Sequence, residues 1–142
     1  SRVDKSEIND TPIINGVELN SPYWITAHLA WAEAFLILNT FGGEVNDKYD
    51  WLNEYGFGTK SAQIKTRPPY DDVLKTLDDI HEKSMKQLRE TQDSFLNEKN
   101  KFGMTFDGKN DNRVSIHHAI RHEPMHIGQL TWFMKSKGMP TF

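Results

Sequence analysis

Residues 70–99 read YDDVLKTLDDIHEKSMKQLRETQDSFLNEK, and the spacing of apolar residues in this stretch decides the fold class. Apolar or small residues recur every three or four positions, and charged residues fill the gaps. This period places the apolar residues on one face of a helix. We predict an amphipathic helix over 70–99, with a core-facing stripe formed by Val73, Leu77, Ile80, Ser84, Leu88, Thr91 and Phe95.

A second helix is predicted upstream, over 21–39. Ser21 and Pro22 supply a capping hydroxyl followed by proline at the first helical position. The glycine pair at 42–43 ends the pattern. Apolar side chains occupy nearly every face of this predicted helix, so we expect the helix to be buried in the core.

The last predicted helix covers 114–137 and ends before Gly138, with two lysines in its final turn. Residues 1–20 mix charges with turn-forming residues and have no helical period, so we expect a loop there. A short aromatic helical segment, YDWLNEYGFG, is expected at 49–58. No segment gives a convincing strand signal, and there are no internal repeats.

These elements predict a single all-α domain over residues 1–142, built as an antiparallel helical bundle. Three long helices leave an apolar flank that a fourth helix would normally cover. The chain starts at Ser1 without a methionine. We therefore expect the covering element to be a helix upstream of Ser1 or part of a second subunit.

The composition limits which partners, metal ligands and cellular location we expect for the protein. The 142 residues have a net charge of -3 and no dense basic run, so we do not expect nucleic acid as a partner. Cysteine is absent, so any metal must be held by nitrogen and oxygen ligands. The most apolar segment, 25–38, is too short to cross a bilayer and nothing resembles a signal peptide, so we expect a soluble, cytoplasmic protein.

Three of the six histidines predict a metal site. His122 and His126 are one helical turn apart and can reach the same ion. His28 lies on the face of its own helix that should point into the bundle, where an unpaired imidazole would cost about 1–3 kcal/mol. Three nitrogen ligands leave a fourth coordination position open, as in catalytic zinc sites. Taken singly, each histidine is more often a hydrogen-bonded core or surface residue; their combination favours metal.

Two other metal-site patterns also match. The stretch HEPMH at 122–126 fits the zincin motif H-E-x-x-H, but no His, Asp or Glu follows it to act as a third ligand. A ferritin-like site would pair Glu123 with His126 and Asp78 with His81, which leaves the other two candidate ligands unexplained.

Several neighbours of the site have open roles. His118 lies one turn before His122 and could support it, while His81 has a smaller chance of touching the site. Pro124 cannot donate a backbone hydrogen bond, so we expect a kink there in a helix that nevertheless continues. Trp24, Trp31, Tyr55 and Phe57 are candidate pocket walls, although aromatic residues at helical spacing more often belong to the core.

The stretches NSPYWITAHLAWAE and AIRHEPMHIGQL, with WLNEYGFG between them, resemble the DinB/YfiT-like superfamily from about Leu19 to Lys137. The resemblance includes the H-x-G-Q sequence at 126–129. It implies an up-down-down-up four-helix bundle whose first helix is missing from this chain. It also implies a divalent metal bound by His28, His122 and His126.

The resemblance implies a reaction class only broadly. Relatives resemble thiol S-transferases or metal-dependent hydrolases that act on small molecules, with Zn, Ni or Fe as the expected metal. Glu123 is the best candidate for a catalytic base, and orienting a histidine is an equally good role for it. A low-molecular-weight thiol is an expected partner, and a homodimer is the expected assembly. The alternative function is a non-catalytic helical interaction module with a structural or adventitious metal.

Overall fold

The computed structural model describes residues 5–43, 47–103, 105–106 and 108–141. Three long helices dominate it: α1 (Pro22–Glu33), α2 (Tyr70–Glu90) and α3 (Asn112–Ser136). A π-helix, η1 (Ala34–Asn39), continues α1 directly. The 3-10 helices η2 (Asp47–Tyr55), η3 (Ser61–Gln63) and η4 (Asp93–Asn97) lie in the connections. The fold is all-α, as the sequence predicts.

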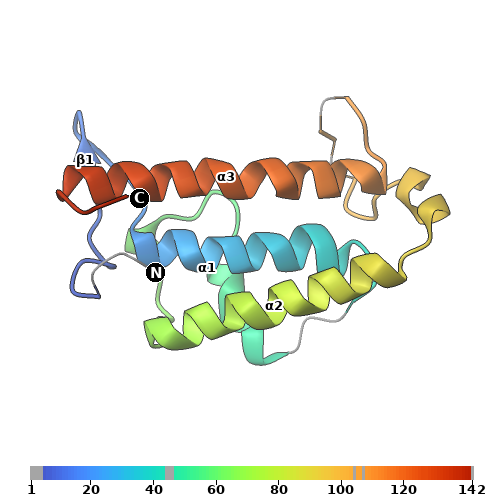
Figure 1. Ribbon diagram of the computed structural model, residues 1–142, viewed down its shortest axis with the longest axis horizontal. Coiled ribbons are helices and arrows are strands. Elements are labelled where there is room, and N and C mark those ends of the chain that lie inside the picture. Colours follow the sequence, from blue (N-terminus) through green and yellow to red (C-terminus); the bar gives the residue numbers. More distant parts are fainter. Residues whose placement is uncertain (1–4, 44–46, 104, 107, 142) are drawn as a thin grey trace.

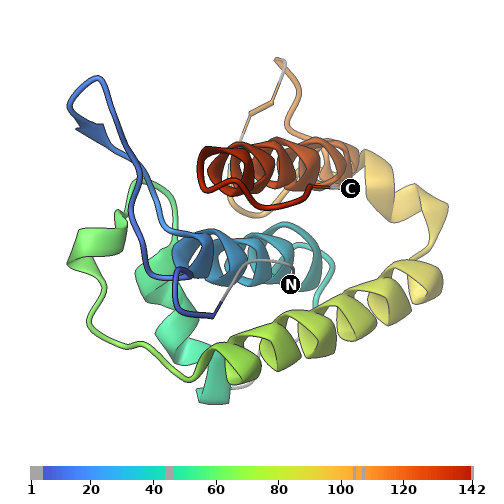
Figure 2. The same cartoon turned by 60° about the vertical axis from the view of Figure 1, so that its left-hand side comes forward.

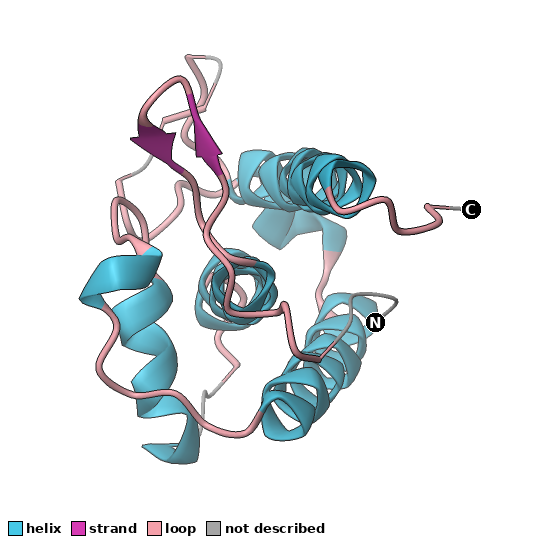
Figure 3. Ribbon diagram, turned by 90° about the vertical axis from the view of Figure 1, so that its left-hand side faces the viewer, coloured by secondary structure: helices cyan, strands magenta, loops and turns pink. Residues whose placement is uncertain are grey.

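The order of directions matches a four-helix bundle without its first helix. In Figure 1, α1 and α2 run in the same direction and α3 runs back against both. The connection from α1 to α2 therefore returns along the bundle, and it carries η2 and η3. Seen end-on in Figure 3, α1 lies between its neighbours, with α2 and α3 on one side and η2 on the other.

The core is built around α1. Its alanines Ala27 and Ala30 are fully buried and let neighbouring elements approach closely. Val73 and Ile80 of α2, both from the predicted stripe, are also fully buried against it, and Tyr55 of η2 fills the opposite side. This central position explains why the segment at 21–39 is apolar nearly all round.

Two predicted helix ends need correction. The segment 70–99 is α-helical only to Glu90, because Thr91 adopts an extended conformation. Phe95 still reaches the core through η4, where its ring lies 5.5 Å from that of Phe41. The apolar period therefore continued past the end of the helix. At 21–39 the α-helix ends at Glu33, and the rest is π-helix.

Residues 5–20 are not simply a loop. Strands β1 (Ile13–Ile14) and β2 (Val17–Glu18) form a small antiparallel hairpin. Asn15 and Gly16 make its turn with φ of 51° and 78°, the left-handed conformation that Asn-Gly supplies in two-residue hairpin turns. This dipeptide was the sequence signal for the hairpin. Figures 1 and 2 show the hairpin standing beside the C-terminal end of α3.

Helix α3 continues through Pro124, as predicted, in one unbroken ribbon. The ribbon follows a nearly straight path in Figures 1 and 2, without the kink expected at the proline. Pro124 is exposed, so its ring lies on the solvent side of the helix. No helix in the described part of the chain combines the length and apolar character needed to cross a membrane.

An apolar groove of about 500 Å³ runs between α1, α2 and α3. Its lining includes Leu36, Leu77 and Ile120, and Ile120 is largely exposed. This groove is the flank that three helices were expected to leave open. Its coverage by an upstream helix or a second subunit stays a prediction.

Candidate metal centre

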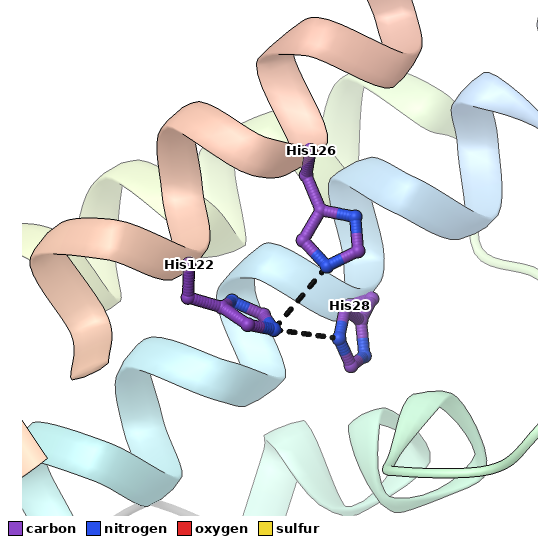
Figure 4. A group of neighbouring side chains, drawn as sticks. All are labelled: His28, His122 and His126. Carbon is purple, nitrogen blue, oxygen red and sulfur yellow. Dashed lines mark hydrogen bonds between the residues drawn. The ribbon is translucent and has the colours of Figure 1, made fainter. Parts of the chain in front are cut away.

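Three histidines from two helices converge inside the bundle (Figure 4). The Nε2 atom of His122 lies 3.3 Å from Nε2 of His28 and 3.2 Å from Nε2 of His126. One nitrogen from each residue falls within 4.8 Å of the other two. The structure thus brings together the three residues selected from the sequence, and the cluster can hold a metal ion.

Local structure places each ring. Ser21 caps α1 by accepting a hydrogen bond from the backbone N–H of Trp24, which sets where the helix begins and which face carries His28. On α3, His122 and His126 follow each other by one turn and point toward α1. All three side chains are buried, with exposed fractions of 3%, 6% and 6%.

Two hydrogen bonds determine which ring nitrogens face the centre. Nδ1 of His28 lies 2.6 Å from the carbonyl oxygen of Tyr55, which can only accept, so this nitrogen carries the proton. Nδ1 of His126 lies 2.8 Å from Oε1 of Gln129 and donates to it in the same way. In the neutral rings, Nε2 of His28 and Nε2 of His126 therefore present lone pairs.

Burial keeps the rings neutral. It lowers the pKa of His28 and of His122 from 6.5 to about 4 and lowers the pKa of His126 as well. The neighbouring imidazoles lower the pKa of His122 further, because a second positive charge nearby is unfavourable. Neutral imidazole is the form that binds metals, so the rings are ready to bind at neutral pH without losing a proton.

The donor set fits a divalent metal ion. With lone pairs on Nε2 of His28 and His126, a single proton on Nε2 of His122 can satisfy only one of its two close contacts. A shared cation would satisfy all three nitrogens. Metal–nitrogen bonds of about 2.0–2.1 Å in a tetrahedral arrangement place ligand nitrogens about 3.4 Å apart. The two measured separations, 3.3 and 3.2 Å, are close to that value.

Aromatic rings hold His28 from both sides. The indole of Trp24 stacks on the imidazole at a centroid distance of 4.5 Å, and the indole of Trp31 stacks on it at 5.6 Å. Phe57 meets both His28 and Trp31 edge-on. This packing restricts rotation of the ring and removes water from around it.

A cavity of about 1160 Å³ opens beside the cluster. His28 and Gln129 lie in its lining, together with Trp24 and Phe57, two of the four aromatic residues expected as walls. The other two have different places. Trp31 packs behind the imidazole, and Tyr55 is fully buried in the core and contributes its carbonyl oxygen.

The other candidate residues lie apart from the cluster. Glu123 is exposed and borders the groove between the helices, on the flank of α3 that faces Glu33. His81 is paired with Glu33 at 2.9 Å, and the Asp78 and His81 pair of the ferritin-like alternative lines this groove, which His122 also borders.

His118 is the nearest further histidine. Its ring lies 5.4 Å from that of His122 and stacks on Phe106 at 4.1 Å. It therefore borders the cluster through His122, in line with a supporting role.

Sequence reasoning missed three contributors to the site. Gln129 was noted only as part of a family motif, although its position three residues after His126 could have suggested a partner on the same helix face. The carbonyl of Tyr55 left no signal in the sequence, because any residue has one. The β1–β2 hairpin, which lines the cavity through Ile13 and Ile14, was signalled by Asn15–Gly16.

Fold and site together define a helical-bundle protein with a buried three-histidine centre capable of holding a metal ion. A family model described as the DinB superfamily matches residues 1–130. The chain belongs to this superfamily. No curated protein and no solved structure matched the chain in the corresponding comparisons.

Proposed function

We propose that His28, His122 and His126 bind one divalent metal ion through their Nε2 atoms and that the protein is a metal-dependent enzyme acting on a small molecule. The observation that carries the proposal is the convergence of three buried, neutral imidazoles whose Nδ1 atoms are already engaged or turned away from the centre. Zn, Ni and Fe are the metals that best suit three nitrogen ligands and an open position.

The reaction classes we propose are thiol S-transfer and hydrolysis. A divalent ion at the site would act as a Lewis acid and lower the pKa of a coordinated water or thiol toward neutrality. The protein's own part is positioning. Tyr55 and Gln129 orient two of the ligands, and the stacked indoles of Trp24 and Trp31 exclude water from His28.

The cavity favours an enzyme over a structural metal site. A structural centre is closed by four protein ligands, whereas this cluster offers three histidines and borders a cavity through His28. The non-catalytic interaction module remains the alternative function. We further propose that the protein works in the cytoplasm, and the absence of cysteine supports this location. We also propose that it forms a homodimer.

We propose Glu123 as a base that does not face the cavity beside His28 directly. Its exposed position on the groove side of α3 does not point it into the cavity beside His28. It could act on the centre through His122, its neighbour in sequence, or through a water. Replacing it with glutamine would separate this role from metal binding.

Metal analysis of untagged protein tests the proposal. We expect one ion per chain in the wild type and less than a tenth of that in His28→Ala and His122→Ala. His81→Ala is the matched control, because it removes an exposed histidine outside the cluster. Unchanged stoichiometry in both ligand variants would show that the metal, if any, binds elsewhere.

A substrate screen then separates the two functions. Metal-loaded wild type is assayed with small thiols plus electrophilic acceptors, and with esters and amides. Activity that disappears in His122→Ala supports an enzyme. A protein whose melting temperature collapses on metal removal, and which is inactive in both panels, fits the structural alternative.

A further inference from the structure

The cavity beside His28 is bordered by a large share of the exposed apolar side chains. Nine large apolar side chains are exposed in the described part of the chain, and five of these line this cavity. Scattered exposed apolar residues need no explanation, but a group gathered around a concave site indicates binding. We call this group the apolar rim: Ile13, Ile14, Leu19, Phe57 and Trp132.

The rim comes from three separate segments. Ile13 and Ile14 belong to β1, Phe57 follows η2, and Trp132 lies on the C-terminal half of α3. Trp132 and Ile13 are 74% and 70% exposed. An α3 residue this open to water would usually be polar, so its apolar nature at the cavity mouth is unexpected for a purely structural role.

The interior of the cavity is also apolar. Trp24, Ile25 and Phe133 are buried and form part of its lining, and Trp24 leads directly to His28 through their stacked rings. The apolar surface thus extends from the mouth to a proposed metal ligand. A cavity of about 1160 Å³ is of the order of small-molecule sites, which typically have roughly 300–1,000 Å³.

The described lining has two acidic side chains, Asp10 and Glu18, and two basic ones, Lys60 and Lys137, so it has no excess of either charge. Lys137 contacts Asp10 at 2.6 Å and Glu7 at 3.4 Å, and the carboxylate of Glu18 accepts a hydrogen bond from the hydroxyl of Thr11 at 2.7 Å. Lys60, the remaining charged residue of the described lining, is exposed. The walls therefore offer little to the body of a highly charged ligand.

We infer that this cavity binds small molecules with an extended apolar chain or ring system, held between the β1–β2 hairpin and α3. The polar, reacting end of the molecule lies toward His28. The inference deepens the proposed function and rests on it only for the chemistry at that end. It names the substrate class as amphipathic small molecules rather than compact, highly charged ones.

A homologous series of n-alkyl hydroxamates, from acetohydroxamate to decanohydroxamate, tests the inference by calorimetry on zinc-loaded protein. The hydroxamate group binds the metal, and the alkyl chain reports on the cavity. We expect affinity to rise by up to about fourfold per methylene, the value for complete burial, until the chain fills the cavity. A series without any increase in affinity would overturn the inference.

Rim variants place the chain. Trp132→Ala and Ile14→Ser alter exposed positions, so both proteins should fold, and each should reduce the increment per methylene to less than half of that in wild type. Ile127→Ala is the matched control, an exposed apolar residue of α3 outside the described cavity lining. An increment in the rim variants equal to that of wild type would also overturn the inference.

A second arm separates this inference from the proposed function. The n-alkyl alcohols lack a metal-binding group, and their affinity for metal-free protein should still rise with chain length. If hydroxamates bind metal-loaded and metal-free protein equally while the increment persists, the proposed metal site fails and the inference stands.

Binding to phosphatidylcholine vesicles is the last test. Binding to them that depends on the rim, without any chain-length increment, would assign the rim to a lipid surface and overturn the inference.

Discussion

His126 and Gln129 are joined by a hydrogen bond of 2.8 Å between Nδ1 of the imidazole and Oε1 of the amide, within one turn of α3. The amide oxygen accepts the Nδ1 proton and turns the lone pair of Nε2 toward His122 and His28. The H-x-G-Q sequence at 126–129 thus acquires a physical role: Gln129 sets the tautomer and the orientation of a candidate ligand.

Gln129→Leu should weaken metal binding without abolishing it. The substitution removes the acceptor at similar side-chain size, so His126 loses its fixed tautomer, and we expect affinity to fall about 10–100-fold. Competition with a chromophoric chelator measures this. Gln129→Glu keeps an acceptor and should retain most of the affinity. Lys135→Ala, an exposed position on the same helix, is the control. Equal affinity in Gln129→Leu and wild type would refute the role.

The stability of metal-free protein should depend on pH through the buried imidazoles. In the unfolded chain these rings have a pKa of about 6.5, while in the folded protein the pKa of His28 and His122 is about 4. Between these values the unfolded state binds more protons, so stability is fully present above about pH 7 and is lost as pH falls toward about 4.

The size of this effect is on the order of 3 kcal/mol for His28, whose pKa falls from 6.5 to about 4, and His122 contributes in the same direction. Urea denaturation of metal-free protein at a series of pH values measures it. His122→Ala should show a shallower loss of stability toward acid, whereas His117→Ala, at an exposed position, should follow wild type. Identical profiles for His122→Ala and wild type would contradict the assignment.

Trp24 should report metal binding by fluorescence. Its indole stacks on His28, so Ni²⁺ or Cu²⁺ at the site should quench its emission strongly. Trp24→Phe should bind the ion and lose part of the quenching, and Trp31→Phe, which removes the second indole stacked on His28, should lose a further part. Trp51→Phe is the matched control, because Trp51 contacts Tyr55 rather than a candidate ligand. Quenching that survives in Trp24→Phe and disappears in Trp51→Phe would place the ion elsewhere.

Ser21→Ala should destabilise the protein by about 1–2 kcal/mol. The buried hydroxyl accepts the backbone N–H of Trp24 at the start of α1, and the substitution leaves that donor without a partner. The free energy of unfolding in urea is the readout, with Ser94→Ala, which removes an exposed hydroxyl, as the control. Since the cap fixes the start of the helix that carries His28, metal affinity should fall along with stability. A change below a few tenths of a kcal/mol would show that the cap is dispensable.

Glu123→Gln should leave metal stoichiometry unchanged, since Glu123 lies on the groove side of α3 and outside the histidine cluster. Once a substrate is found, a drop in kcat of about 10²-fold or more with metal retained would support a proton-transfer role. Unchanged kcat would leave Glu123 as a surface residue of the groove. Loss of metal would instead make it a ligand or a ligand's partner.

Much of this architecture could be predicted from the spacing of apolar residues along the helices and from the capping residues at their ends. The stripe on α2 is visible because one face is apolar and the other charged, and Val73 and Ile80 are buried as expected. Periodicity does not show where hydrogen bonding changes, so it missed both the switch to π-helix at Ala34 and the end of α2 at Glu90. Phe95 kept the period because burial, not helix geometry, selects apolar residues.

The candidate site also has one part that the sequence could predict and one part that it could not. The histidines could be selected because buried imidazoles need partners, and helical spacing gave their directions. Their partners could not be selected equally well. The acceptor of His28 is a backbone carbonyl, which has no residue type to recognise. Likewise, a hairpin of two-residue strands has too little alternation to be seen, apart from the Asn15–Gly16 turn.

The carbonyl at Tyr55 gives the site an uneven tolerance to mutation. Side-chain replacement cannot delete a main-chain acceptor, so the hydrogen bond to His28 survives most substitutions that leave the path of the chain intact. Changes that move the backbone after η2, such as a proline or a deletion near Gly56, would reach the centre from outside it. Amino-acid substitutions along 47–56 should therefore leave the site unchanged far more often than insertions and deletions there.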